Sequence, residues 1–272
     1  MPRVSVGDVE IHYCLDDFTE PWKESGVILM HHGYCRNSKF WNPWVPKLAG
    51  KCKVLRFDVR GCGESSIPPE GYSWSVEQLA KDALGLIDKL GIQKVHWVGE
   101  ASGGIMGILF TASYPDRVSS LVICDTPLKF GSQQFSDYSM GQEDPGAALQ
   151  KMGFKEWCAK TMGHRIDRSK ADPKLVQWVE SEMLKTPEHV AKSLIRIFAR
   201  ADVSPLLPKI KIPTLVLASS KRTSDWLSHL RVMKEHLPHA HFEVFDDVGP
   251  GLHLVIPDRC TSAVLKFLGK IG

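Results

Sequence analysis

Val-His-Trp-Val-Gly-Glu-Ala-Ser-Gly-Gly, residues 95–104, reads as a short buried strand, a sharp turn and the start of an apolar helix. A turn of this kind that presents a nucleophile has the pattern small-x-nucleophile-x-small, because the backbones on either side of it approach closely. Glycines stand two residues before and two residues after Ala101. If Ser102 were the nucleophile, the bulky Glu100 would occupy one of the crowded positions. The pattern therefore favours position 101, where alanine has no reactive side-chain atom.

An alanine at this position has three explanations. A serine has been replaced deliberately to trap a ligand, or the chain is a natural relative without catalytic activity, or Ser102 is the nucleophile after all. We favour the first, because the other residues expected in such a site, described below, are present.

Charge, cysteine content and hydropathy exclude several classes of protein. The chain has 34 basic and 31 acidic residues and a net charge of +3, too balanced to indicate nucleic-acid or membrane binding. Seven cysteines without a CxxC pair argue against a disulfide framework or a zinc site. We find no signal peptide and no apolar run near the ~20 residues of a membrane span, so we expect a cytoplasmic protein. No cofactor or metal is implied, the expected partner is a small molecule, and a homodimer stays open.

Strand and helix patterns alternate along most of the chain. Strand patterns occupy residues 4–5, 9–13, 26–30, 53–57, 94–98, 121–124, 213–218 and 242–245, and helical patterns occupy 76–90, 103–113, 226–236 and 258–268. This alternation predicts an α/β fold, a mostly parallel twisted sheet with helices on both faces. We expect a core domain at 1–127 and 209–272. A helical cap at 128–208 would lie over the carboxyl edge of the sheet, where such sheets bind ligands.

Several motifs together resemble the α/β-hydrolase family. They are His32-Gly33, Asp-Val-Arg-Gly-Cys-Gly-Glu-Ser at 58–65, the turn at 95–104, Tyr-Pro-Asp-Arg at 114–117 and a late histidine. The resemblance covers nearly the whole chain and implies the α/β-hydrolase fold with a nucleophile–histidine–acid triad. It does not specify the substrate, because one fold hosts many reactions.

The triad needs a base and an acid beside the nucleophile. His253, on the glycine-rich loop expected at residues 249–257, is the predicted base. In most of the family the acid follows the strand at 213–218, but here Arg222 stands at that position. Asp125, at the end of the strand before the cap, is therefore the predicted acid. The alternatives are Asp225, Asp246 and Asp247.

An oxyanion hole needs two backbone N–H donors. One is expected from Ser102, directly after the nucleophile position. The other is expected from Tyr34 in the His-Gly-Tyr loop, and Gly33 and Tyr34 are also predicted to contact substrate.

Within the family, the chain most resembles the fungal zearalenone lactonases. The resemblance rests on Ala101-Ser102-Gly103, on Cys124-Asp125-Thr126-Pro127 and on the vacant late acid position. It implies serine acyl transfer that opens a macrocyclic resorcylic-acid lactone. Bulky cap residues are candidates for holding the ring, although at helical spacing such residues are more often core: Met152, Phe154, Trp157, Trp178 and Met183.

Rival functions can be weighed at the same positions. Epoxide hydrolases are disfavoured because Cys35 replaces their usual proline, and haloalkane dehalogenases because Ser102 replaces their usual tryptophan. A C–C bond hydrolase or a general carboxylesterase shares the triad and stays open. A non-catalytic small-molecule-binding homologue also stays open, since Ala101 alone would support it.

Overall fold

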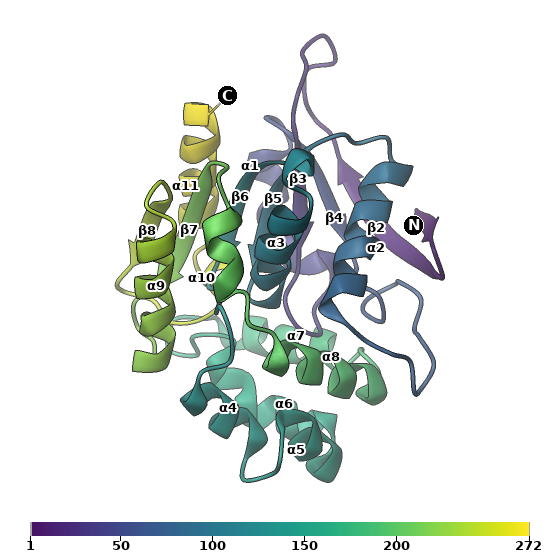
Figure 1. Cartoon of the computed structure of the whole chain (residues 1–272), viewed down its shortest axis with the longest axis vertical. Coiled ribbons are helices and arrows are strands. Elements are labelled where there is room, and N and C mark those ends of the chain that lie inside the picture. The colour runs from purple at the N-terminus through teal and green to yellow at the C-terminus, as the bar shows by residue number, and fades with distance from the viewer. Residues whose placement is uncertain (1, 272) are drawn as a thin grey trace.

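The computed structural model describes residues 2–271, which build an eight-stranded sheet in the order β1-β2-β4-β3-β5-β6-β7-β8 (Figure 1). β1 and β2 pair antiparallel, as do β2 and β4, and the remaining pairs are parallel. The strands are β1 Arg3–Val6, β2 Val9–Asp16, β3 Val27–His31, β4 Lys53–Phe57, β5 Val95–Glu100, β6 Val118–Cys124, β7 Thr214–Ser219 and β8 His241–Phe245.

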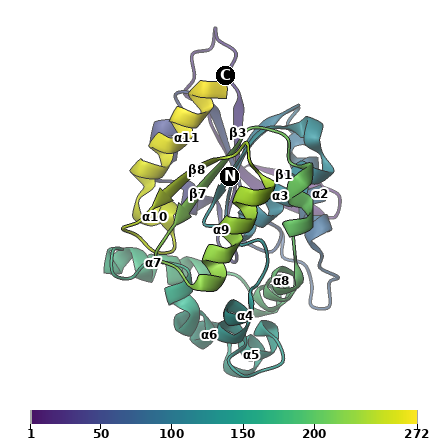
Figure 2. The ribbon, with the colours of Figure 1, turned by 60° about the vertical axis from the view of Figure 1, so that its left-hand side comes forward.

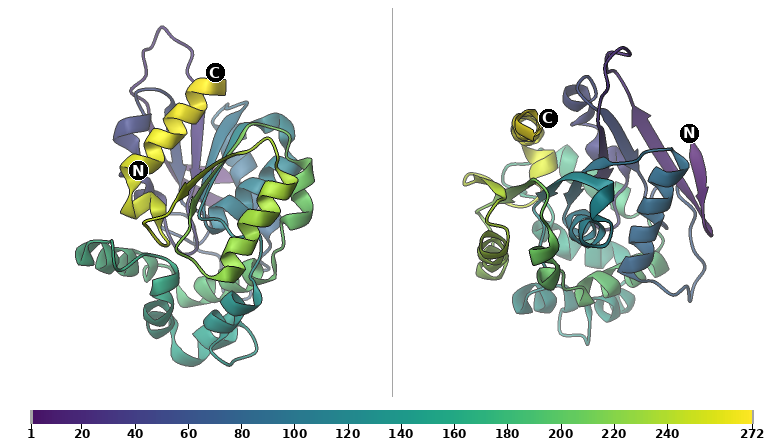
Figure 3. Two further views of the ribbon diagram at one scale, coloured as in Figure 1. Left: turned by 90° about the vertical axis from the view of Figure 1, so that its left-hand side faces the viewer. Right: turned by 45° about the horizontal axis from the view of Figure 1, so that its top comes forward.

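Helices cover both faces of the sheet. Figure 3 shows α11 on one face and α2, α3 and α9 on the other, and α1 contacts α11. The α-helices are α1 Val45–Leu48, α2 Val76–Lys89, α3 Ser102–Ser113, α4 Ser132–Ser139, α5 Pro145–Met152, α6 Phe154–Thr161, α7 Pro173–Met183, α8 Glu188–Arg200, α9 Ser224–His236, α10 Leu252–Val255 and α11 Pro257–Ile271. Short 3₁₀ helices are η1 Ser38–Trp41, η2 Pro115–Arg117, η3 Met162–His164 and η4 Ser204–Lys209.

The sheet separates two hydrophobic cores. Successive side chains of a strand point to opposite faces, so in β3 Ile28 and Met30 join the core beneath α1 and α11, while Leu29 joins the core beneath α2 and α3. Because both faces are buried, the central strands read as continuous apolar runs.

The segment between β6 and β7 is helical and lies beside one edge of the sheet (Figures 1 and 2). An isolated bridge between Lys129 and Asp202 joins its two ends, and the Val203 amide donates to the Leu128 carbonyl at 3.0 Å. α4 and α8 of this segment carry residues that line a cavity with the ends of β5 and β6, which places the segment at the carboxyl edge of the parallel strands.

The predicted fold class is confirmed, with local differences of which two concern the site. The strand before the helical segment begins at Val118, three residues earlier than its apolar run indicated. The segment around His253 is not a plain loop, because residues 252–255 form the single-turn helix α10. No helix described between residues 2 and 271 is long and apolar enough to cross a membrane.

Candidate active site

The turn between β5 and α3 is centred on Ala101. Its backbone has φ +49° and ψ −115°, a conformation that costs a non-glycine residue on the order of 1–3 kcal/mol. A Cβ on Gly99 would lie 2.2 Å from the Gly103 carbonyl oxygen, and a Cβ on Gly103 would lie 2.1 Å from the His31 carbonyl oxygen. Both positions therefore require glycine. The apex of the turn is Ala101 and not Ser102.

The loop after β3 packs against this turn. A Cβ on Gly33 would lie 2.3 Å from Oε2 of Glu100, so a side chain there would displace the carboxylate. The Tyr34 hydroxyl donates to the carbonyl of Ala191 in α8 at 2.9 Å, which links the loop to the helical segment. Ser102 begins α3, so its amide has no intrahelical acceptor. Tyr34 and Ser102 line the same cavity as the apex of the turn.

Asp125 follows β6 with a positive φ of 44° and is buried beside the turn. One carboxylate oxygen accepts from the Ser219 amide at 3.1 Å and from the Ser219 hydroxyl at 2.9 Å. The other accepts from the amides of Gly251 and Leu252 at 3.1 and 3.4 Å. Asp125 thus holds the backbone just before His253, and no hydrogen bond joins its carboxylate to that imidazole.

His253 is 1% exposed in α10 and faces a different partner. Its Nε2 lies 3.2 Å from Nη1 of Arg36, and its ring packs against Trp41 with centroids 5.3 Å apart. With the guanidinium as donor, Nε2 is the acceptor and the proton sits on Nδ1, which has no partner among residues 2–271. Burial, with a smaller contribution from Arg36, lowers the pKa of His253 well below its usual value. The ring is therefore neutral at pH 7.

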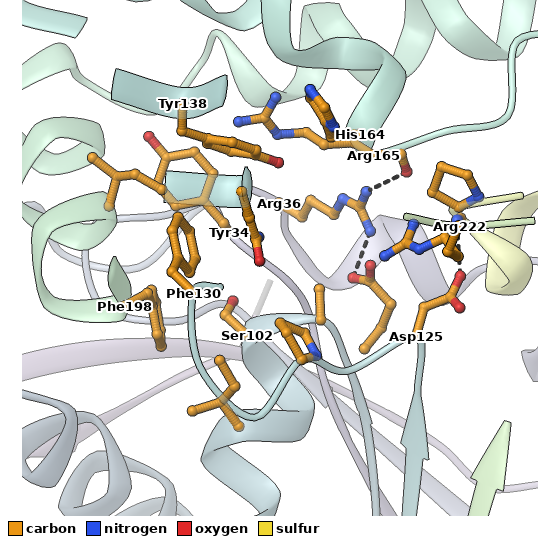
Figure 4. A pocket seen from close by; sticks show the side chains of 18 residues that line it. Tyr34, Arg36, Ser102, Asp125, Phe130, Tyr138, His164, Arg165, Phe198 and Arg222 are labelled. Atoms are coloured by element: carbon orange, nitrogen blue, oxygen red, sulfur yellow. Dashed lines mark hydrogen bonds and ion pairs between the residues drawn. The ribbon is translucent and has the colours of Figure 1, made fainter. Parts of the chain in front are cut away.

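Arg36 and Glu100 form a buried ion pair between the turn and α10, with Nη1 and Oε2 2.5 Å apart. Burial raises the pKa of Glu100, and the attraction of Arg36 opposes that rise. The guanidinium also donates to the carbonyl of Arg165 at 3.2 Å (Figure 4). Arg36 thus connects the turn, the helical segment and His253.

The alternative acids have other partners. Asp225 accepts from the amide of Gln133 in α4 at 2.7 Å. Asp247 pairs with Arg259 at the surface, and Asp246 is exposed. Asp125 is the candidate acid that lines the cavity at Ala101.

The cavity above Ala101 has a volume of about 80 Å³ and a mixed lining (Figure 4). This is well below the roughly 300–1,000 Å³ of typical ligand pockets. Four of its lining residues also line a neighbouring cavity of about 440 Å³: Gln134, His164, Arg222 and Pro250. The apolar lining of the cavity above Ala101 includes Ile105, Pro127, Phe130, Tyr138, Ile195 and Phe198. Its charged lining is Arg36, Glu100, Asp125, Arg165 and Arg222.

The five predicted cap contacts lie outside this lining. Trp157 is fully buried, donates to the Tyr138 carbonyl at 2.8 Å and packs edge-on against Tyr34. Trp178 packs on Phe40 at 4.7 Å. Buried or half-buried side chains within the helical segment complete the set: Met152, Phe154 and Met183. Their contact with ligand stays a prediction.

Sequence reasoning missed most of the charged lining. Arg222 was visible as a departure from the family pattern, but Arg36 and Arg165 carry no motif of their own. Their role depends on contacts across the chain, such as that between Arg36 and His253. Among residues 2–271, no group of three His, Cys, Asp or Glu side chains is arranged to hold a metal ion.

Comparisons with known proteins agree with this architecture. Residues 26–257 match the family described as alpha/beta hydrolase fold. The chain is 32% identical over 276 residues to "Putative carbamate hydrolase RutD" of Caulobacter vibrioides, covering 98% of this chain and 99% of the relative. It is 26% identical over 212 residues to 3-oxoadipate enol-lactonase 2 of Acinetobacter baylyi, covering 77% of this chain and 76% of that protein.

Among solved structures, the enol-lactonase from Burkholderia xenovorans LB400 superposes with a TM-score of 0.87 at 23% identity, covering 98% of this chain and 100% of the other. That likeness concerns the fold, and the family match covers most of the sequence. The chain belongs to the α/β-hydrolase fold family.

Proposed function

We propose that this protein is an acyl-transfer hydrolase for a lactone or ester, in a form whose nucleophile position carries alanine. The observation that carries the proposal is the strained backbone of Ala101, which directly precedes α3 and lines the cavity. A positive φ is unfavourable for alanine and gives its methyl group no role. A serine with the same backbone would direct its hydroxyl group into the cavity. As it stands, the protein binds its ligand without turning it over.

The chemistry follows for a serine at position 101. Its Oγ attacks the carbonyl carbon while Nε2 of His253 takes the hydroxyl proton, and the collapse of the intermediate expels the alcohol, which takes that proton. A lactone keeps its alcohol tethered to the acyl group. Water then attacks the acyl carbon with His253 again as base, the bond from that carbon to Oγ breaks, and Oγ takes the proton back from His253. The acid leaves, as a hydroxy acid where the substrate was a lactone.

His253 has to turn for this chemistry. Its Nε2 now faces Arg36, and its Nδ1–H has no acceptor. Rotation of the ring toward the turn would release Nε2 to the nucleophile and bring Nδ1–H toward Asp125, which already holds the preceding backbone. The amides of Tyr34 and Ser102 would then receive the oxyanion.

A zearalenone-type macrolactone is the specific substrate that we propose to test first. The support is the acid position at Asp125 and the aromatic lining from Phe130, Tyr138 and Phe198. The cavity of about 80 Å³ is smaller than such a ring, which would therefore also occupy the neighbouring cavity of about 440 Å³. The relatives named as an enol-lactonase and a carbamate hydrolase favour carbonyl hydrolysis in general.

The test is hydrolysis by Ala101→Ser beside the unaltered protein, on p-nitrophenyl butyrate, on zearalenone and on a vinylogous 1,5-diketone. The variant should exceed the unaltered protein by on the order of 10⁴–10⁶ in kcat. Adding His253→Ala or Asp125→Asn to the variant should remove most of that gain. Faster hydrolysis of zearalenone than of the simple ester would support the macrolactone. The reverse would favour a general carboxylesterase, and activity on a vinylogous 1,5-diketone alone would favour a C–C bond hydrolase.

A second function is favoured by one observation, the contact of His253 with Arg36 instead of Asp125. In a ligand-binding homologue without catalysis, the buried Arg36–Glu100 pair would hold the imidazole permanently away from the turn. Absence of hydrolysis in Ala101→Ser, together with tight ligand binding by both proteins, would select this function.

A further inference from the structure

The cavity at Ala101 contains more cationic than anionic side chains. Arg36 is paired with Glu100, and both oxygens of Asp125 accept hydrogen bonds from Ser219 and from backbone amides. Arg165 and Arg222 line the same cavity, and within residues 2–271 neither has a carboxylate at ion-pair distance.

Arg165 is 8% exposed, which is unusual for a cation without an acid. Its guanidinium donates to the Thr161 hydroxyl, and its Nη2 has no hydrogen-bond partner in the described chain. The guanidinium carbon lies 4.9–5.6 Å from the ring centroids of Tyr34, Tyr138 and Trp157. The aromatic faces offset part of the cost of burying this charge. The N–H donors on Nη2 of Arg165 still lack an acceptor, which leaves part of that cost uncompensated.

Arg222 approaches the cavity from the end of β7, where the family pattern would place the acid. Its guanidinium stacks on Trp226 at 4.7 Å, which orients it without neutralising it. Its charge and that of Arg36 both act to lower the pKa of Glu100, so the two arginines share one carboxylate neighbour. Figure 4 shows Arg36 and Arg222 on the side of Asp125, and Phe130 and Phe198 on the opposite side of the cavity.

We propose that the cavity takes a ligand that combines an apolar body with a carboxylate, and that Arg222 and Arg165 bind the carboxylate. The inference rests on the proposed function for the reacting ester or lactone group, and it replaces the neutral zearalenone-type macrolactone by another substrate class, an acidic ester or lactone. The planar forks of arginine match the geometry of a carboxylate. The apolar body would lie against Ile105, Phe130 and Phe198, and Figure 4 shows Phe130 and Phe198 across the cavity from Arg222.

The test compares two probes of equal shape in binding to the unaltered protein. One is the monophenyl ester of adipic acid, and the other is the same ester with a carboxamide in place of the free carboxylate. Calorimetry should give at least about tenfold tighter binding of the acid, since a hydrogen bond to a charged group is stronger than one to a neutral amide. Arg222→Gln should reduce that preference to less than about threefold.

Two further variants make the result specific. Arg165→Lys keeps the charge but loses the fork, and we expect it to weaken the preference for the acid while the protein stays folded. Arg200→Gln removes a charge from the same helical segment at a side chain that is 78% exposed, and should leave the preference unchanged.

The outcomes separate this inference from the proposed function. Preference for the acid in the unaltered protein, with no hydrolysis by Ala101→Ser, would retain the anion site and reject the hydrolase. Equal affinity for both probes, measurable binding of neither, or a preference that survives Arg222→Gln would overturn the anion site, whatever Ala101→Ser does.

Discussion

At the scale of single residues, the backbone of Ala101 is the clearest functional signal. Alanine rarely adopts a φ of +49° with a ψ of −115°, and the surrounding structure has to hold it there. The sequence could predict this residue because glycines at fixed spacing leave a steric signature. It could not predict the orientation of His253, because the Arg36 contact joins residues 217 positions apart.

The strain at position 101 should be measurable. Ala101→Gly should raise the free energy of unfolding by about 1 kcal/mol, because glycine adopts this conformation at little cost. Ala112→Gly, in the last turn of α3, should lower it by up to about 1 kcal/mol. Urea unfolding of both variants gives the comparison, and destabilisation by Ala101→Gly would show that the turn is not strained.

At the scale of elements, the site depends on how closely β5 approaches α3. The alternating apolar runs were enough to predict both elements, because the periods of strand and helix differ. The single turn of α10 was not predicted, since four residues of Leu-His-Leu-Val carry too little periodicity. Its position instead comes from tertiary contacts, among them the indole N–H of Trp44 donating to the His253 carbonyl at 2.8 Å.

The contact between β5 and α3 tolerates no added methyl group. Gly99→Ala would place Cβ 2.2 Å from a backbone oxygen, which cannot move without displacing α3. We expect a loss of about 3 kcal/mol in unfolding free energy. The matched control is Gly269→Ala in α11, where nothing lies within 4 Å of the added atom, and there alanine should stabilise by up to about 1 kcal/mol. Equal effects of the two changes, measured by thermal unfolding, would contradict the packing described for the turn.

At the scale of the whole molecule, the two cores enclose several neutral histidines. Burial lowers the pKa of His31 to about 3, and it also lowers the pKa values of His32 and His253. In the unfolded chain these rings take up protons near pH 6.5, while in the folded protein they do not. The unfolded state therefore binds more protons in this window, and stability falls as pH decreases from about 6.5 toward 3.

His31→Phe should flatten this dependence. The ring of His31 stacks on Trp97 at 5.4 Å, a contact that phenylalanine can keep. Between pH 6 and pH 5 the unaltered protein should lose about 1 kcal/mol more unfolding free energy than the variant. At pH 7.5 the ring is neutral in both states, so any difference there reports packing alone. Identical slopes in urea titrations at the two lower pH values would mean that folded His31 takes up a proton in this range.

The most direct test of the account is whether position 101 can act as the nucleophile. We would treat the unaltered protein and Ala101→Ser with diethyl p-nitrophenyl phosphate, which phosphorylates an activated serine Oγ and releases p-nitrophenol. Intact-mass and peptide mass spectrometry should find a single diethylphosphoryl group at position 101 of the variant, dependent on His253, and none on the unaltered protein. Labelling of Ser102 in the unaltered protein, or no labelling of the variant, would contradict the account.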